Sequence, residues 1–277
     1  MPKGLYICYF GINEPLVQTQ VLPYLREIRK GGVEMHLLTF EPALGEWEGG
    51  AIAELEMVLA ADDIKWHRLK YHKWPSVPAT LYDLMIGMFK VLSLGRKYRF
   101  SVYHSRGHIP APVACIAKWA LGGKFLFDIR GFMPEEYSDA GVWKANGVLF
   151  RTVKLVEKWL MSKADGFVVL TERAREILFP ESTETGFDKL GRPVEVIPCC
   201  VDLERLIAGQ SAADTRENRL PDAAGKKVIV YVGSFGGWYM TDEMLDMFDH
   251  ARRGGDSSFA LILTQRGVDG IVNGLVK

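Results

Sequence analysis

The sequence predicts an α/β protein: a Rossmann-like doubly wound parallel sheet, followed by an incomplete second Rossmann-like unit. Two observations favour this class. Short apolar runs alternate with longer segments of helical period, which is the pattern of a parallel sheet with crossover helices. The composition is that of an ordinary globular protein, with 48% hydrophobic and 25% charged residues in a chain of 277. This length allows one large domain or two moderate ones.

The first part of the chain predicts about seven strands with intervening helices. The apolar runs expected to form strands are residues 5–10, 33–40, 64–69, 100–104, 124–128, 166–170 and 194–197. The segments of helical period between them include residues 51–60, 80–97 and 147–163, and a helix that starts at Pro110 or Pro112. Thr171 is expected to cap the helix that follows it, since a threonine side chain can accept a bond from the first free N–H groups. Together these elements form one doubly wound domain.

The composition changes after residue 200. Small and polar residues dominate up to Lys226, as expected of an interdomain connection. We therefore predict an N-terminal domain at 1–200, a linker at 201–226 and the start of a second domain at 227–277. That second part predicts only the strands 228–232 and 259–264 with a helix at 242–253 between them. So few strands cannot bury both faces of a parallel sheet, and the second domain is expected to be incomplete.

Charge and cysteine usage limit the class of partner. Lysine plus arginine number 34 and acidic residues also number 34, which disfavours nucleic acid as the main partner. The four cysteines form no CxxC pair and no metal-ligand spacing, so free thiols and no metal site are expected. No secretory signal and no run of about 18 apolar residues is evident, and the expected location is the cytoplasm.

Polar residues follow two of the predicted strands. Ligands of open α/β sheets bind beyond the carboxyl ends of the strands. His104, Arg106 and His108 lie in YHSRGHIP at such an end and could bind hydroxyl groups or phosphate. The alternative is a polar loop with surface histidines.

A carboxylate and a guanidinium follow the next strand. In FDIRGFMPEEY, Asp128 ends the strand, Arg130 lies two residues beyond it, and Gly131 lets the chain turn away. This pair could orient hydroxyl groups and stabilise phosphate, or its members could pair only with each other. Glu135 and Glu136 are interpreted as a solvated turn rather than an acid/base pair.

Two glycine-containing loops are candidates for phosphate binding. Gly11 follows the first strand, and the helix after it could hold an anion at its N-terminus. Gly233 and Ser234 follow the first strand of the second part, where backbone N–H groups and the serine hydroxyl could contact a diphosphate. The alternative for Gly11 is a simple turn.

Several segments together resemble the family 4 glycosyltransferases, which are retaining, nucleotide-sugar-dependent enzymes of the GT-B fold. The segments are QVLPYLREIRKGGVEMHLLTFEP, the run from YHSRGHIPA through FDIRGFMPEEY, EKWLMSKADGFVVLTERAREIL and VIPCCVDLERL. The last resembles the family's VIPNGVD junction between domains, and YVGSFGGWY resembles the strand and loop after it. The similarity follows the family's order over nearly the whole chain.

This resemblance implies an acceptor domain and a donor domain. A sugar passes from a nucleoside diphosphate sugar to a hydroxyl of a glycan or lipid-linked acceptor with retention, in glycan or polysaccharide biosynthesis and without a metal or further cofactor. By position, Asp128 and Arg130 would be catalytic. The same comparison assigns acceptor binding to His104, Arg106 and His108, and donor-phosphate binding to Gly11, Gly233 and Ser234.

The sequence departs from the family pattern at three places. The first loop lacks paired glycines, Cys200 replaces the junction glycine, and the later E-x7-E segment is absent. The resemblance therefore implies an incomplete form with little activity alone. The alternatives are a split subunit whose partner chain supplies the donor domain, and a GT-B sugar epimerase.

Peripheral contact with the inner face of a membrane is a further alternative. The helices expected at 81–99 and 147–163 carry basic residues, and basic amphipathic helices can lie on anionic lipid. The favoured interpretation is a Rossmann helix with one buried and one solvated face.

Overall fold

The computed structural model describes residues 1–42, 49–200, 227–233, 240–253 and 258–263. The chain separates into two units, Met1–Asp202 and Leu203–Lys277. The predicted linker at 201–226 lies outside the described residues. Each unit is taken by itself.

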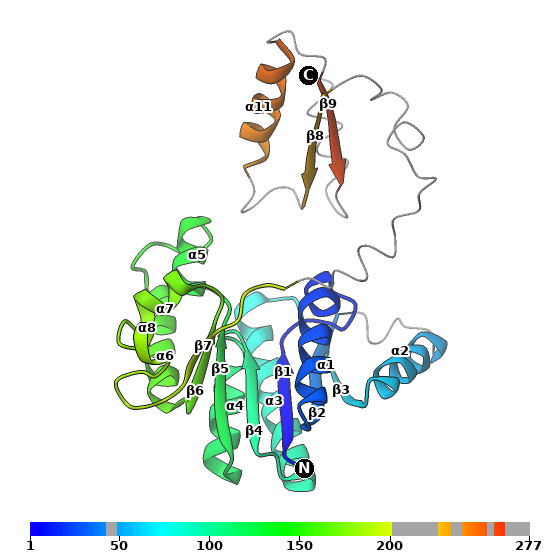
Figure 1. Ribbon diagram of the computed structural model, residues 1–277, viewed down its shortest axis with the longest axis vertical. Helices are drawn as coiled ribbons and strands as arrows, with labels where there is room; N and C mark the ends of the chain where they lie inside the picture. Colours follow the sequence, from blue (N-terminus) through cyan, green and yellow to red (C-terminus); the bar gives the residue numbers. More distant parts are fainter. Residues whose placement is uncertain (43–48, 201–226, 234–239, 254–257, 264–277) are drawn as a thin grey trace. The chain divides into compact units, whose positions relative to one another are not determined.

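The first unit is built on a parallel sheet of seven strands (Figure 1). The strands are β1 (Lys3–Cys8), β2 (Glu34–Glu41), β3 (Ile64–Lys70), β4 (Val102–Arg106), β5 (Lys124–Ile129), β6 (Gly166–Val169) and β7 (Val194–Val196). Their order is β3-β2-β1-β4-β5-β6-β7, which confirms the doubly wound sheet. The order reverses between β1 and β4, and ligands of such folds bind at the carboxyl ends of the strands beside this switch point.

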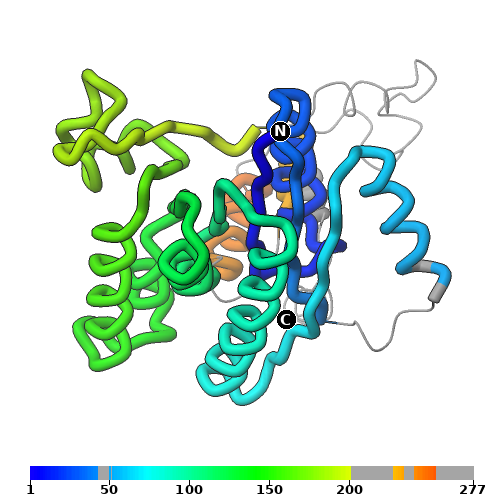
Figure 2. Tube along the Cα trace, turned by 90° about the horizontal axis from the view of Figure 1, so that it is seen from below, coloured from blue at the N-terminus to red at the C-terminus, as the bar shows by residue number. Residues whose placement is uncertain are grey.

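Helices connect the strands in the alternating manner that the sequence predicts. They are the π-helix η1 (Val17–Val21), α1 (Leu22–Lys30), α2 (Gly49–Ala61), α3 (Ser76–Tyr98), α4 (Ala111–Leu121), α5 (Met133–Asp139), α6 (Val148–Lys163), α7 (Glu172–Leu178) and α8 (Ser182–Thr185). Helix α2 lies at the β3 edge of the sheet, and α6 lies toward the opposite edge (Figures 1 and 2). The predicted cap is confirmed, because Thr171 Oγ1 accepts a bond of 3.0 Å from Ala174 N–H.

Two apolar cores lie on the two faces of the sheet. Successive side chains of a strand point to opposite faces, so β1 contributes Leu5 and Ile7 to one core and Tyr6 and Cys8 to the other. The first core includes residues of α3, α4 and α6, and the second includes residues of η1 and α1. The same alternation decides which polar residues of β4 and β5 can meet.

The predicted end of β4 is wrong by two residues. The strand continues past His104 to Arg106, because it pairs with β1 on one side and β5 on the other over its whole length. Backbone hydrogen bonds to both neighbouring strands keep these polar residues in β4, although the sequence pattern assigns them to a loop. Strand β1 ends earlier than predicted, at Cys8, and the short helix α5 was not predicted.

Helix α3 is long and apolar enough to pass the length and composition test for a membrane span. In this fold one of its faces packs into the first core through Val91 and Leu94. Asp83 on that face is buried and accepts bonds from Tyr9 Oη at 2.8 Å and from His72 N–H at 3.0 Å. The opposite face is exposed, so α3 has one buried and one exposed face as expected, and the exposed face carries apolar side chains.

The second unit contains two parallel strands, β8 (Lys227–Val232) and β9 (Ser258–Leu263). Helix α11 (Thr241–Arg253) connects them in sequence. The three elements predicted for this part of the chain are confirmed, with ends shifted by one residue.

A buried histidine pair predicts acid sensitivity of the first unit. His36 Nδ1 lies 2.9 Å from His67 Nε2, and the two rings stack. Burial, assisted by His36, lowers the pKa of His67 from 6.5 to about 4. A histidine with a depressed folded pKa contributes stability that is present above its unfolded pKa and lost as the pH falls toward the folded value. We expect urea unfolding to show a loss of about 3 kcal/mol between pH 7 and pH 4 from this group.

The variant His67→Gln is the control for this effect. Glutamine keeps a polar partner for His36 and does not titrate, so the variant should lose the part of the pH dependence between pH 7 and 4 that His67 contributes. An unchanged pH profile in His67→Gln would assign the acid sensitivity to other groups.

Candidate functional site

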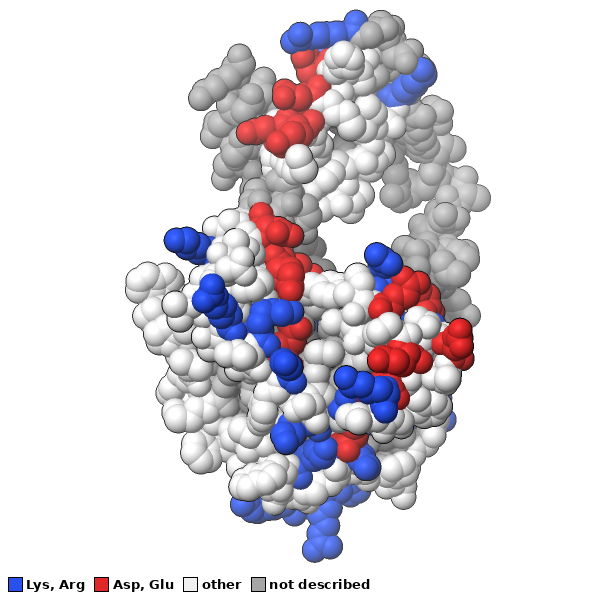
Figure 3. Space-filling view, turned by 90° about the vertical axis from the view of Figure 1, so that its left-hand side faces the viewer, with Lys and Arg blue, Asp and Glu red and all other residues white. Residues whose placement is uncertain are grey.

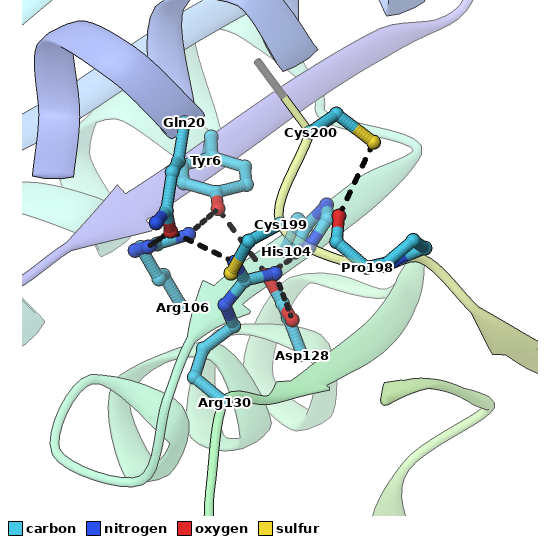
Figure 4. Close-up of polar contacts among 9 residues, drawn as sticks. All are labelled: Tyr6, Gln20, His104, Arg106, Asp128, Arg130, Pro198, Cys199 and Cys200. Carbon is cyan, nitrogen blue, oxygen red and sulfur yellow. Dashed lines mark hydrogen bonds and ion pairs between the residues drawn. The ribbon is translucent and has the colours of Figure 1, made fainter. Parts of the chain in front are cut away.

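Four of the sequence-predicted residues meet at the carboxyl ends of β1, β4 and β5. The strand register aligns Tyr6 with His104, and it aligns Cys8 with Arg106 and Arg106 with Asp128. These side chains therefore share one face of the sheet. Arg130 lies just beyond β5 and turns back toward Asp128 (Figure 4). We call Tyr6, Gln20, His104, Arg106, Asp128 and Arg130 the Asp128 cluster.

Asp128 is the centre of this cluster and is only 1% exposed. Its Oδ2 accepts a bond of 3.3 Å from Tyr6 Oη and lies 3.6 Å from His104 Nε2, whereas Oδ1 lies 3.4 Å from Arg130 Nη1. Burial by itself raises the pKa of Asp128. His104, Arg130 and Arg106 outweigh that effect and hold the pKa below its ordinary value. Asp128 is therefore ionised at neutral pH, where it acts as a hydrogen-bond acceptor and not as a general acid.

Gln20 joins the two arginines of the cluster. Its Oε1 accepts a bond of 2.7 Å from Arg106 Nη2 and one of 3.0 Å from Arg130 Nη2. Gln20 lies in the π-helix η1, a rare geometry that often occurs at functional sites. Arg106 also donates to Tyr6 Oη at 3.5 Å. Burial, followed by the charge of Asp128, raises the pKa of Tyr6 well above its ordinary value, so its hydroxyl stays a donor.

The His104 ring packs against the rings of Tyr6 and Tyr24. Its ring centroid lies 4.4 Å from that of Tyr6 and 5.8 Å from that of Tyr24, the latter in perpendicular contact. Its Nε2 is buried and makes no hydrogen bond within the described part of the chain. His104 is 3% and His108 9% exposed, so the alternative of a polar loop with surface histidines is wrong.

His108 does not join the Asp128 cluster. Gly107, with a φ of +77°, turns the chain at the end of β4, and His108 Nε2 lies 3.4 Å from Glu157 Oε2 on α6. Lys154 pairs with Glu157 at 2.9 Å and with Glu135 at 2.8 Å, which ties α5 and α6 together. His108 thus has a structural partner, and acceptor binding by it stays a prediction.

The two glutamates after β5 are solvated as predicted, with Glu136 exposed and the Glu135 side chain 41% exposed, but they belong to a helix and not to an irregular turn. They lie in the first turn of α5, where Glu135 pairs with Lys154. Glu136 accepts a bond of 3.1 Å from Phe132 N–H. A Cβ on Gly131 would collide with the Glu136 carboxylate, so this glycine makes room for the cap rather than for a left-handed turn.

Gly11 is buried against the end of β2. A Cβ there would lie 2.8 Å from Glu41 Oε2 and 2.9 Å from Pro42 Cδ. Both carboxyl oxygens of Glu41 lie 3.0 Å from Ile12 N, so this loop N–H already has a hydrogen-bond acceptor. Close packing explains the glycine, and its contact with a donor phosphate stays a prediction.

The second candidate phosphate loop is described only at its start. Gly233 directly follows β8, and Ser234 lies outside the described residues. Their contact with a diphosphate also stays a prediction.

Sequence analysis did not identify Tyr6, Gln20, Tyr24 or Cys199 as site residues. Cys199 Sγ lies 3.7 Å from Arg130 Nη2, because the segment after β7 passes the end of β5 (Figure 4). All four cysteines are free thiols, as expected. The alternation of tyrosine residues with apolar ones in LYICYF is the one sequence signal that could have placed Tyr6 on the same face as a polar partner.

A search for metal-ligand clusters finds no group of three His, Cys, Asp or Glu side chains within the described residues. The expectation of a reaction without a metal stays a prediction.

Comparison with known proteins identifies one family. Residues 17–182 match the family described as "Glycosyl transferase 4-like domain". No curated protein matches the chain.

Solved structures share the fold at low sequence identity. A glycosyltransferase from Rickettsia africae ESF-5 is 12% identical with a TM-score of 0.57, covering 99% of this chain and 63% of that one. A protein from Listeria monocytogenes described as a UDP-N-acetylglucosamine 2-epimerase is 13% identical with a TM-score of 0.60, covering 99% and 65%. HepE from Anabaena, in complex with UDP-glucose, is 11% identical with a TM-score of 0.57, covering 100% and 65%. The chain therefore spans less than two thirds of the length of these three structures.

The Asp128 cluster predicts a large stability effect from a small substitution. Asp128→Asn keeps the shape of the side chain but leaves Arg130 without its counter-charge. Removing one partner of a buried ion pair costs about 3–5 kcal/mol, which we expect as the loss in unfolding free energy in urea.

Asp165→Asn is the matched control. Asp165 also faces two cations, Lys118 at 2.8 Å and Lys124 at 3.5 Å, but it lies nearer the surface. Its substitution should cost less than about 1 kcal/mol. Equal losses of unfolding free energy in the two variants would mean that burial does not increase the contribution of Asp128 to stability.

Proposed function

The chain belongs to the glycosyl transferase 4-like family, and we propose that it is part of a retaining glycosyltransferase of glycan or polysaccharide biosynthesis. A sugar would pass from a nucleoside diphosphate sugar to an acceptor hydroxyl. The observation that carries the proposal is the ionised Asp128 beside Arg130 at the carboxyl end of β5. This is the position at which doubly wound sheets bind their ligands.

The reaction needs a group that orients the acceptor hydroxyl. Transfer breaks the bond between the anomeric carbon and the diphosphate oxygen, which keeps the electron pair. It forms a bond from that carbon to the acceptor oxygen, whose proton passes to the departing diphosphate. Asp128 can accept a hydrogen bond from this hydroxyl, and its rigid surroundings fix the direction of that bond. Arg130, whose side chain is 18% exposed, is the member of the pair that a ligand can reach from solvent.

The proposed donor contacts lie in loops that directly follow strands. The Anabaena structure named above contains UDP-glucose, which supports a nucleotide sugar as donor here. Gly233 with Ser234, and Gly11 on the first unit, are the proposed contacts of the diphosphate. Backbone N–H groups and positive charges would then stabilise the anionic charge that develops on the leaving group without a metal.

Two alternatives stay open beside this proposal. A split subunit would need a partner chain for full activity, which the coverage of 63% of the Rickettsia structure also permits. A sugar epimerase would act on the nucleotide sugar alone, and the Listeria structure shares the fold. A lipid-linked acceptor would in addition bring the chain to the inner face of a membrane.

Exposed apolar side chains on α3 support contact with lipid. Leu81 is 62%, Met85 51% and Phe89 68% exposed along the outward face of this helix. Arg96 and Lys97 lie in its last turn and complement anionic headgroups. Figure 3 shows the first unit from the side of α6 and α8, where lysines and arginines also lie beside an area without charged side chains.

Turnover with labelled nucleotide sugars tests the proposed reaction. The chain would be incubated with UDP-glucose, UDP-N-acetylglucosamine or GDP-mannose, with and without a panel of methyl glycosides. We expect slow, acceptor-dependent release of the nucleoside diphosphate and a product with the donor's anomeric configuration by NMR. Arg130→Gln should lower this rate by about 100-fold or more, as loss of a transition-state contact does.

Arg173→Gln, an exposed arginine on α7 paired with Glu176, serves as the control and should keep the wild-type rate. Formation of an epimerised nucleotide sugar without an acceptor would show that the reaction is epimerisation and not transfer. Equal rates in Arg130→Gln and Arg173→Gln would show that the Asp128 cluster does not take part in the reaction.

Co-sedimentation with vesicles of equal parts phosphatidylcholine and phosphatidylglycerol tests the lipid contact. We expect binding at low ionic strength that weakens in about 0.5 M salt. The double variant Leu81→Glu with Phe89→Glu should lose it, whereas Ile177→Glu, an equally exposed change on α7, should keep it. Retention of binding by the double variant would exclude α3 as the contact.

A further inference from the structure

Arg106 is a buried cation without an anionic partner. It is 6% exposed, and its guanidinium donates only to neutral groups, Tyr6 Oη and Gln20 Oε1. Across the described ranges, no carboxylate lies within ion-pairing distance of Arg106, and Asp128 is already shared by Tyr6, His104 and Arg130. Buried charges are normally paired, because an uncompensated charge costs several kcal/mol. The cluster therefore contains two guanidinium groups and one carboxylate, an excess of one positive charge.

The geometry shows where a compensating anion would bind. Arg106 Nη2 and Arg130 Nη2 converge on a single atom, Gln20 Oε1, at 2.7 and 3.0 Å (Figure 4). A side-chain amide has nearly the shape of a carboxylate, so this oxygen occupies the place of an anionic oxygen held by two arginines. Gln20 is half-buried and Arg130 reaches solvent, so a ligand can approach from the open side.

We propose that the acceptor carries a carboxylate, as a uronic acid does, which binds between Arg106 and Arg130 in place of the Gln20 oxygen. This inference rests on the proposed transferase function and names the chemical class of its acceptor. One excess positive charge matches a monoanion. A phosphate dianion would leave a net negative charge beside Asp128, which a poorly solvated site disfavours.

Binding of the carboxylate would also position the acceptor for transfer. The Arg130 guanidinium donates to the Gln20 oxygen through Nη2 and lies 3.4 Å from Asp128 Oδ1 through Nη1. The planar guanidinium of Arg130 therefore contacts both the proposed position of the acceptor carboxylate and the carboxylate of Asp128. A sugar whose carboxylate binds at the proposed position would direct a hydroxyl toward Asp128.

Titration calorimetry with the full chain at low ionic strength tests this proposal. The probes are D-glucuronate, D-glucose, inorganic phosphate and UDP. We expect D-glucuronate to bind with a dissociation constant on the order of 1 mM and D-glucose to bind at least 10-fold more weakly.

The variant Gln20→Glu supplies the chain's own carboxylate at the same position. It should weaken D-glucuronate binding at least 10-fold and raise the melting temperature by about 2–4 °C, because it pairs both arginines. Thr19→Glu adds the same charge one residue away on an exposed position and should change neither quantity.

The other outcomes contradict either this inference or the proposed transferase function. Absence of D-glucuronate binding, equal binding of D-glucose, or a lower melting temperature in Gln20→Glu would overturn the carboxylate position. If phosphate or UDP binds more tightly than D-glucuronate and Gln20→Glu abolishes that binding, the two arginines would be assigned to a phosphate group instead. Transfer to neutral acceptors without D-glucuronate binding would reject only this inference, whereas D-glucuronate binding without any nucleotide-sugar turnover would reject only the transferase function.

Discussion

Burial of an ionised carboxylate at Asp128 is the constraint on which the candidate site depends. A carboxylate that is 1% exposed must be compensated, and Tyr6, His104 and Arg130 surround it. These groups come from three neighbouring strand ends, so the strand register itself is part of the site. The π-helix η1 adds Gln20 on the open side. Removing Arg130 would leave the buried carboxylate without its arginine partner.

The polar residues at the end of β4 fall into two groups with different contacts. His104 and Arg106 share a face with Asp128, which His104 contacts at 3.6 Å, whereas His108 lies after a glycine in the left-handed region and contacts Glu157 on α6. All three lie in one short sequence motif and have similar burial. Strand alternation and one backbone turn therefore decide which of them share a face with Asp128 and which pairs with α6.

Sequence patterns predicted the seven strands and their doubly wound arrangement, because apolar periodicity is a local property. They also predicted Asp128 with Arg130, which follow a clear strand. They did not predict the contacts of Gln20 and Cys199 with Arg130, since these join segments 110 and 69 residues apart in the chain. Gly11 was predicted as a phosphate contact from its position alone, but its packing against Glu41 depends on the neighbouring strand and is not visible in its own segment.

The central claim is that Arg106 and Arg130 together hold the carboxylate of an acceptor beside Asp128. NMR spectra of the chain with ¹⁵N-labelled arginine side chains test this most directly during titration with D-glucuronate. The account predicts that the Nε resonances of Arg106 and Arg130 shift together, with one saturating dependence on concentration. Shifts confined to surface arginines such as Arg173, or a shift of Arg130 without Arg106, would contradict it.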